Sequence, residues 1–291
     1  VGGGSLLDGM YEVYADYLVK FVTEYAKQGI TISSLTILNE PSVGALSYPT
    51  MDMNPVEAAE ITRLTGEKLK AADLDVDIVA WDFNYGTGSA ADIYFEEIYG
   101  EGSGSSKYSA MAGLHGYSGD GYFDSASQNG LKVGIELLSR QYGKGSIITE
   151  ITESSGSNDF AANLTYACKN IVINPCSVQY NYDDESWNGC SGSMYWNFVL
   201  TSDGQPTPAQ HGNECYGVIS LDEVNRQGVK IYKYKKSSAY YAMAHMSKFL
   251  YEVDGTPCKG LLATTDYSDL CVAAYYRADG AIVVVVCNTS E

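Results

Sequence analysis

The interpretation of the fold depends on the stretch Leu35-Thr36-Ile37-Leu38-Asn39-Glu40-Pro41. Its first four residues favour a β-strand, and a proline stops that strand directly after a polar pair. An acid at the carboxyl end of a buried strand is costly to desolvate unless it has partners or a task. In a barrel of alternating strands and helices, active sites are built at that end of the strands. The alternative is a strand whose terminal acid simply points into water.

Outward from this stretch, strand and helix patterns alternate along the first 250 residues. Strands are predicted at residues 35–38, 76–80, 111–114, 145–149 and 192–200. Helices are predicted at residues 11–25, 55–72, 90–99, 131–142, 159–173 and 237–250, with a long loop between residues 200 and 237. This alternation indicates parallel strands with helical crossovers. Five such units do not close an eight-stranded barrel, so we expect either an open sheet or a barrel without its first strands.

The pattern changes after residue 250. Short strands are predicted at residues 260–264, 270–276 and 281–287, with turn residues between them. Three antiparallel strands are too few for a stable sheet unless they pack on something else. We therefore expect a barrel domain at residues 1–250 and the start of a β-sandwich domain at residues 251–291.

The charge of the chain limits its partners. Eighteen basic and 36 acidic residues give a net charge of −18, which argues against nucleic acid and anionic membrane surfaces. The sequence has no run of about twenty apolar residues, so we expect no membrane span. Tyrosine occurs 25 times, and exposed tyrosines suit sugar binding, although many of them must be ordinary core or surface residues.

The cysteines and two glycosylation sequons favour a secretory route. The seven cysteines lack the paired spacing of a zinc site, so disulfides are the better interpretation. The odd count leaves at least one thiol free or paired with a segment outside this sequence. Asn163 and Asn288 each begin an Asn-x-Ser/Thr sequon. Four cysteines cluster where long loops are expected: Cys168, Cys176, Cys190 and Cys215.

Two acids end predicted strands and could work as a pair. Glu40 and Glu150 lie 110 residues apart, but all strand ends of a barrel converge on one face. Paired carboxylates are the apparatus of glycoside hydrolysis, and a separation of roughly 5 Å implies retention of configuration. Glu153 is a rival to Glu150 that the pattern alone does not exclude.

Other strand-end residues could line the same cleft. His115 and Tyr117 follow a neighbouring strand, where the histidine could bond a sugar hydroxyl or an acid, although a lone histidine is more often structural. Trp196 and Asn197 could supply a stacking platform and a hydroxyl contact, and Asp82 could line the same cleft. The sequence has no phosphate-binding loop, no dinucleotide fingerprint, no serine-hydrolase elbow and no metal-ligand spacing.

Several motifs in register resemble glycoside hydrolase family 30, close to its glucosylceramidase branch. They include Leu-Asn-Glu-Pro-Ser at residues 38–42, Leu-His-Gly-Tyr at 114–117, Ile-Thr-Glu at 148–150 and Tyr-Trp-Asn at 195–197. Further similar stretches, in family order, lie at residues 3–6, 14–21, 240–249 and 279–285. The resemblance implies a (β/α)8 TIM barrel with an attached β-sandwich and retaining hydrolysis of β-linked glycosides.

The resemblance also implies roles for the candidate residues. Glu40, at the end of the family's fourth barrel strand, would be the general acid/base, and Glu150, at the end of the seventh, the nucleophile, which favours it over Glu153. Asn39 would contact the 2-hydroxyl of the bound sugar. The residues that would lie around the substrate are Asn39, Asp82, His115, Tyr117 and Trp196.

The chain departs from the family in ways that set the remaining expectations. Gly116 and Ser193 stand where relatives have aromatic residues. The family's first three strands would precede this sequence, so we expect a missing amino-terminal barrel segment. We expect a secreted or lysosomal, glucosylceramidase-like enzyme that acts on a β-linked glucoside, glycolipid or glycan without a metal or organic cofactor. The alternatives are a β-1,6-glucanase or xylanase of the same family, or a non-catalytic secreted protein on the same fold.

Overall fold

The computed structural model describes residues 3–44, 49–85, 90–117, 125–151, 164–165, 167–168, 180–181, 186–187, 190–206, 217–250 and 258–288. The chain divides into two compact units. The first consists of Val1–Gly119 and Asn129–Thr149, and the second of Asp120–Gln128 and Glu150–Glu291. The division after Thr149 falls inside a strand, of which Glu150 is the last residue.

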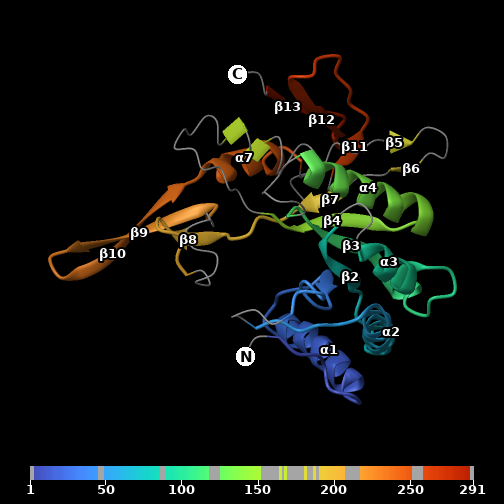
Figure 1. Ribbon diagram of the computed structural model, residues 1–291. Helices are drawn as coiled ribbons and strands as arrows, with labels where there is room; N and C mark the ends of the chain where they lie inside the picture. Colours follow the sequence, from blue (N-terminus) through green and yellow to red (C-terminus); the bar gives the residue numbers. More distant parts are fainter. Residues whose placement is uncertain are drawn as a thin grey trace. The chain divides into compact units, whose positions relative to one another are not determined.

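The first unit contains parallel strands joined by helices (Figure 1). Its strands are β1 (Ser34–Thr36), β2 (Asp77–Asn84), β3 (Ser109–His115) and β4 (Gly145–Glu150). Its helices are α1 (Tyr11–Lys27), α2 (Pro55–Ala71), α3 (Ala91–Tyr99), η1 (Ser106–Tyr108) and most of α4 (Ser125–Tyr142).

The strand order confirms the predicted fold class. The five-stranded sheet has the order β1-β2-β3-β4-β7, where β7 is Cys190–Ser193. β1 pairs in parallel with β2, and β2 pairs in parallel with β3. Parallel neighbours joined by helical crossovers form a TIM-barrel-like sheet, so the carboxyl ends of the strands lie at one edge.

The start of α2 shows how local sequence sets these elements. The Asn54 side chain accepts a hydrogen bond from the backbone N–H of Glu57 at 3.0 Å. The Glu57 carboxylate in turn accepts from the backbone N–H of Asn54 at 2.8 Å. This capping box, with Pro55 in the first turn, confirms the predicted helix start.

An aromatic cluster fills the core beside β2. The ring of Phe95, on α3, is fully buried. Its centroid lies 5.5 Å from that of Tyr85, 5.7 Å from that of Tyr99 and 5.9 Å from that of Trp81. The ring of Tyr142, on α4, lies 6.4 Å away at the edge of this cluster. These contacts connect both helices to β2 and hold that strand in place.

The second unit contains short strands and a small helix. Its remaining elements are β5 (Tyr180–Asn181), β6 (Ser186–Trp187), β8 (Val199–Thr201), β9 (Ile219–Arg226), β10 (Val229–Lys236), α7 (Ser238–Ser247), β11 (Lys259–Leu261), β12 (Leu270–Tyr276) and β13 (Ile282–Asn288). β11, β12 and β13 form an antiparallel sheet, which confirms the three predicted strands. A domain boundary at residue 250 remains a prediction.

Two predictions in the second unit are wrong. The single strand predicted at residues 192–200 is instead β7 and β8, and Trp196 lies between them. The long loop predicted after residue 200 contains the β9–β10 hairpin. Gln227 and Gly228 join its strands with φ angles of 54° and 82°. Positive φ at both residues matches a type I′ turn, whose twist suits a tight hairpin.

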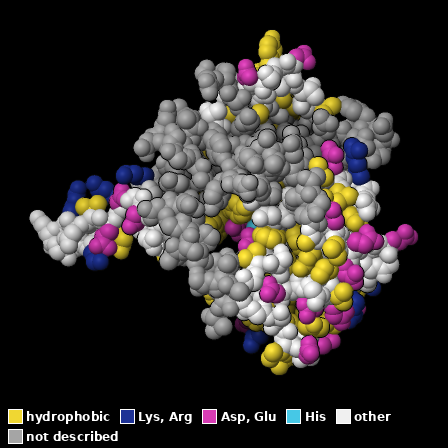
Figure 2. Space-filling model, viewed as in Figure 1, with side chains coloured by type: hydrophobic (Ala, Val, Ile, Leu, Met, Phe, Trp, Pro, Cys, Tyr) yellow, Lys and Arg dark blue, Asp and Glu magenta, His cyan; other side chains and the backbone are white. Residues whose placement is uncertain are grey.

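This hairpin, labelled in Figure 1, is exposed along most of β10 and is rich in lysine. Figure 2 shows dark blue and yellow side chains together over it. Lys230 pairs with Glu223 at 3.1 Å, and Lys235 pairs with Asp222 at 3.0 Å. The hairpin carries Arg226, Lys230, Lys233, Lys235 and Lys236 against Asp222 and Glu223.

Some predictions fall outside the described residues. These are Cys176, Cys215, Glu153, Asn163 and most of the helix predicted at residues 159–173. The structure describes the other five cysteines and shows no disulfide between any two of them. Asn288 is the last residue of β13. Within the described part of the chain, the helices are too short or too polar to cross a membrane.

Candidate active site

Glu40 is placed by contacts that begin before the site itself. β1 ends at Thr36, two residues earlier than predicted. The Tyr14 hydroxyl, on α1, donates to the carbonyl of Ile37 at 2.6 Å. Burial raises the pKa of Tyr14, so this hydroxyl remains a donor. The backbone N–H of Glu40 then donates to the carbonyl of Asp82 at 2.8 Å, which ties the segment to β2.

The backbone of Glu40 is strained. Its φ is 49°, in the left-handed region that residues other than glycine seldom adopt. Such a conformation costs about 1–3 kcal/mol and persists only where the surroundings enforce it. Asp73 and Gln227 have similar φ angles of 56° and 54°, so this conformation alone does not assign a role to Glu40.

His115 lies between Glu40 and a second acid. It is the last residue of β3, and its side chain is fully buried. Nδ1 lies 3.0 Å from Glu40 Oε1, and Nε2 lies 3.1 Å from Asp82 Oδ1. Of the two partners the sequence suggested for this histidine, a sugar hydroxyl or an acid, the structure shows the acid.

Asp82 is held by a residue that sequence reasoning missed. Thr149, on β4, donates its hydroxyl to Asp82 Oδ1 at 2.5 Å. Asp82 lies on β2 and Thr149 on β4, so their side chains meet over β3, the strand between them. The β3 residue beneath this contact is Gly113, which pairs with Asp82 in the sheet register. A Cβ on Gly113 would lie 2.7 Å from Thr149 Oγ1 and 2.9 Å from Asp82 Oδ1. A glycine inside a predicted strand is a signal for such a close approach.

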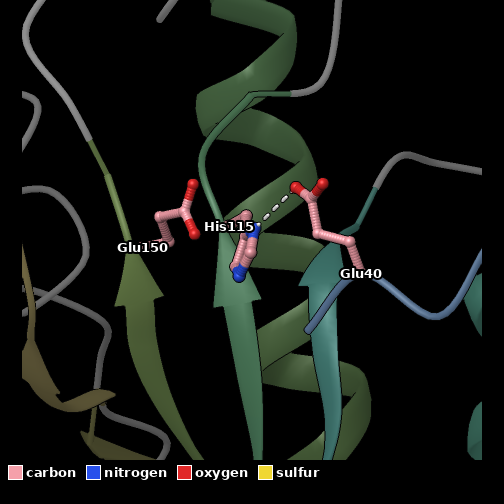
Figure 3. Close-up of side chains that lie close together, drawn as sticks. All are labelled: Glu40, His115 and Glu150. Carbon is pink, nitrogen blue, oxygen red and sulfur yellow. Dashed lines mark hydrogen bonds and ion pairs between the residues drawn. The ribbon is translucent and has the colours of Figure 1, made fainter. Parts of the chain in front are cut away.

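Glu150 follows Thr149 as the last residue of β4 and comes close to His115 and Glu40. One carboxylate oxygen of Glu40, one ring nitrogen of His115 and one carboxylate oxygen of Glu150 all lie within 4.8 Å of one another. Figure 3 shows His115 between the two glutamates. His115 and Glu150 end β3 and β4, and Glu40 lies on the segment that follows β1. The two acids predicted from strand ends 110 residues apart in sequence therefore lie together.

This group can do two kinds of chemistry. Two carboxylates at this spacing can divide the work between proton transfer and nucleophilic attack on an anomeric carbon. Two carboxylates and one imidazole are also ligand types that bind divalent metals. Glu40, His115 and Glu150 are the residues that would hold such an ion.

The other predicted site residues lie close by in the chain. Asn39 immediately precedes Glu40, and its side chain is exposed. The ring of Tyr117 lies 6.0 Å from that of His115, edge to face, and its backbone N–H donates to Asn84 Oδ1 at 2.9 Å. Asn84 was not predicted.

Trp196 belongs to the second unit. Its backbone N–H donates to the carbonyl of Ile151 at 2.8 Å. Ile151 is the residue after Glu150, so Trp196 is tied to the chain segment that leaves β4. The Trp196 side chain is half-buried.

A barrel-like parallel sheet that brings two carboxylates together at its carboxyl-terminal edge is an arrangement that suits glycoside hydrolysis. The family model described as "Glycosyl hydrolase family 30 TIM-barrel domain" matches residues 2–250. The chain therefore belongs to glycosyl hydrolase family 30.

Individual relatives support this membership. The chain is 28% identical over 251 residues to endo-1,6-beta-D-glucanase neg1 of Aspergillus fumigatus, which covers 85% of this chain and 43% of that protein. It is 25% identical to lysosomal acid glucosylceramidase of Mus musculus, with 100% and 53% of the two chains covered. The solved structure of the endo-beta1,6-glucanase BT3312 matches with a TM-score of 0.76 at 25% identity, over 98% of this chain and 58% of that one. The chain thus spans about half the length of the curated relatives that it matches.

Proposed function

We propose that this chain carries the catalytic carboxylates of a retaining β-glycoside hydrolase that acts on β-glucosides. The observation that carries the proposal is the approach of Glu40 and Glu150 to within 4.8 Å, beside His115. Retaining enzymes hold their carboxyl groups about 5–5.5 Å apart, whereas inverting enzymes need a wider gap for water. In this proposal Glu40 is the general acid/base and Glu150 is the nucleophile.

In the first step, Glu150 attacks the anomeric carbon from the face opposite the leaving group. The bond from that carbon to the glycosidic oxygen breaks, and Glu40 gives its proton to this oxygen. The products of the step are the free alcohol and a glycosyl ester of Glu150.

In the second step, a water molecule attacks the same carbon. Glu40, now a carboxylate, takes a proton from the water while the ester bond to Glu150 breaks. The sugar leaves with its original configuration, and both carboxyl groups return to their starting protonation states. The exposed Asn39 side chain would contact the 2-hydroxyl beside the acid. No step requires a metal or an organic cofactor.

The relatives narrow the substrate class. One has a name that specifies a β-1,6-glucan, and the other has a name that specifies glucosylceramide. Both substrates present a β-linked glucose at the bond to be broken, which is the shared chemistry that we assign to this site. A β-1,6-glucan is the second, more specific candidate, because the solved structure quoted above is also an endo-β1,6-glucanase.

A secreted or lysosomal location is part of the proposal. One relative is named as lysosomal. The sequons at Asn163 and Asn288 in this sequence are consistent with passage through the secretory route.

The test is the variant Glu150→Ala in the full-length protein. We expect hydrolysis of an activated aryl β-glucoside to fall by more than about 10⁴-fold, because removal of a nucleophile stops covalent catalysis. Added azide should restore turnover and give the α-glucosyl azide, since azide enters the vacant space from the nucleophile's face. The product is identified by proton NMR.

Two further variants make this test specific. Glu40→Ala with azide should give the β-glucosyl azide, because Glu150 still forms the ester and azide then displaces it. Glu136→Ala, an exposed glutamate on α4, should hydrolyse like the wild type. Unchanged hydrolysis by Glu150→Ala contradicts its assignment as the nucleophile. A wild-type protein that hydrolyses neither β-1,6-glucan nor glucosylceramide, and that a mechanism-based covalent inhibitor does not label, supports the non-catalytic alternative.

A further inference from the structure

We propose that Asp82 and Thr149 are positioning residues that fix which nitrogen of His115 carries the proton and thereby control proton transfer at Glu40. This inference rests on the proposed function, because it assigns Glu40 the role of acid/base. It assigns Asp82 a task different from the substrate contact predicted from sequence.

The first argument is that Asp82 faces protein partners. It is 5% exposed, and its Oδ1 lies within hydrogen-bond distance of both Thr149 Oγ1 and His115 Nε2. A carboxylate can only accept, so both neighbours must donate to it. Loss of either donor would leave the buried charge of Asp82 poorly compensated, so the carboxylate keeps both hydrogen bonds. These two bonds fix its position.

The second argument concerns the tautomer of His115. If Nε2 donates to Asp82, a neutral ring has its lone pair on Nδ1, 3.0 Å from Glu40 Oε1. Nδ1 then accepts a hydrogen bond from a protonated Glu40. A protonated ring instead donates from Nδ1 to an ionised Glu40. His115 can therefore complement both states of the acid/base without moving.

The third argument links this geometry to the two reaction steps. When Glu40 gives its proton to the leaving oxygen, it becomes a carboxylate next to Nδ1. A proton taken up from solvent water by Nδ1 stabilises that carboxylate, and the negative charge of Asp82 stabilises the protonated ring. When Glu40 takes a proton from the attacking water in the second step, Nδ1 gives its proton back to solvent and the neutral ring returns. Asp82 thus acts on Glu40 through His115.

The other groups around His115 fit this assignment. Glu150 contributes a second carboxylate within 4.8 Å, so it also favours a protonated ring. The rings of Phe83 and Tyr117 each lie 6.0 Å from the imidazole, edge to face, and restrict its rotation. The Tyr117 hydroxyl is the remaining titratable group on these neighbours.

The decisive variant is Asp82→Asn in the full-length protein. An amide has no negative charge and can present N–H to Nε2, which favours the tautomer with the proton on Nδ1. The corresponding change in a Ser-His-Asp triad keeps the geometry but gives the wrong tautomer. We expect kcat/KM for a β-glucoside with a poor leaving group to fall by about 10–100-fold, within the range of general acid catalysis. The value for the 2,4-dinitrophenyl glucoside should change less than about 3-fold, because this leaving group needs no proton.

Variants at Thr149 separate positioning from folding. Thr149→Val removes the donor at nearly constant volume, and we expect a loss of about 3–10-fold on the poor leaving group, in line with one lost hydrogen bond to a charged group. Thr149→Ser keeps the hydroxyl and should restore most of the activity. Thr62→Val is the matched control, because Thr62 is a buried threonine on α2 whose hydroxyl donates to Ala58. It should leave both substrates unaffected.

A second readout does not depend on activity. The chain has three histidines, so ¹⁵N-histidine labelling with His115→Gln for assignment reports the tautomer of His115. We expect the proton on Nε2 of the neutral ring in the wild type, and on Nδ1 in Asp82→Asn. If the wild type hydrolyses no β-glucoside but the imidazole responds as expected, the proposed function fails while the positioning of His115 by Asp82 stands. Equal losses on both leaving groups, or an unchanged His115 tautomer in Asp82→Asn, overturn the inference.

Discussion

Two regions of this chain combine charged and aromatic side chains in opposite ways. At the carboxyl ends of β1 to β4, the acids Glu40 and Asp82 face a buried histidine, and an aromatic cluster packs behind β2. In the β9–β10 hairpin, lysines and tyrosines alternate along a strand that is exposed on both faces. The Lys230 and Glu223 side chains, which form an ion pair, are 67% and 44% exposed.

The difference lies in what fixes the side chains. An exposed ion pair is hydrated in the folded and unfolded states, so it is worth only about 0–1 kcal/mol and does not hold one geometry. A buried acid must have its hydrogen bonds, and those bonds define where each atom lies. We infer that the first region can support chemistry because burial gives its polar atoms defined positions.

The largest expected effect comes from the aromatic residues of the two regions. Phe95→Ala removes a fully buried ring and should lower the free energy of unfolding by about 3–5 kcal/mol. Tyr234→Ala removes the side chain of a residue that is 68% exposed, and it should change the free energy of unfolding by about 0.5 kcal/mol or less. Urea denaturation followed by circular dichroism measures both. Similar losses for the two variants would show that the hairpin is packed in solution.

The next effect tests the close approach at the site. Gly113→Ala would place a Cβ 2.7 Å from Thr149 Oγ1, so the threonine or Asp82 must move. We expect a loss of about 1–3 kcal/mol in the free energy of unfolding, as for other overpacked sites. Hydrolysis of a β-glucoside should fall as well, because the support of His115 is disturbed.

Gly145→Ala is the matched control in the same sheet. Its added Cβ would meet the nearest side chain, Met111, at an ordinary 3.5 Å. We expect unchanged stability or a gain of about 0.4–1 kcal/mol, because alanine restricts the unfolded chain. If Gly113→Ala lowers the free energy of unfolding no more than Gly145→Ala does, the contact between Thr149 and Asp82 does not require a glycine at position 113.

The two regions also differed in how well the sequence predicted them. Glu40, His115 and Glu150 were found because each follows an apolar run that predicts a buried strand. Their juxtaposition then follows from parallel strands, whose carboxyl ends lie together. Their catalytic roles remain proposals.

The missed features depend on register and exposure, which periodicity does not reveal. Thr149 and Gly113 matter only because β3 and β4 place them beside Asp82, and that alignment is a property of the folded sheet. The hairpin was predicted as a loop because the alternation of apolar and charged residues in β10 changes phase between Ile231 and Tyr232, so the pattern predicts no single buried face. Its turn at Gln227 and Gly228 also lacks the Asn-Gly or Asp-Gly pair that best predicts a hairpin.

The smallest expected effect is a pH dependence at the edge of the aromatic cluster. Tyr142 packs against Phe95 and donates its hydroxyl to Glu96 at 3.0 Å. Burial, together with that hydrogen bond and the charges of Glu96 and Asp92, raises the pKa of Tyr142 to about 12. The pKa of a tyrosine in an unfolded chain is about 10. Between about pH 10 and 12, Tyr142 is therefore ionised in the unfolded state but still protonated in the folded state.

The sign follows from this difference. The contribution of Tyr142 is fully present below about pH 10 and is lost as the pH rises through about 12. Tyr142→Phe should therefore lower the free energy of unfolding by about 0.5–1 kcal/mol at neutral pH, and this deficit should shrink above pH 10. Denaturation at several pH values, with tyrosinate absorbance as a second probe, measures it. If the difference in unfolding free energy between Tyr142→Phe and the wild type stays constant up to pH 11.5, the pKa of Tyr142 is the same in the folded and unfolded states. Tyr142 would then resemble the hydrated side chains of the hairpin, which folding does not hold in one environment.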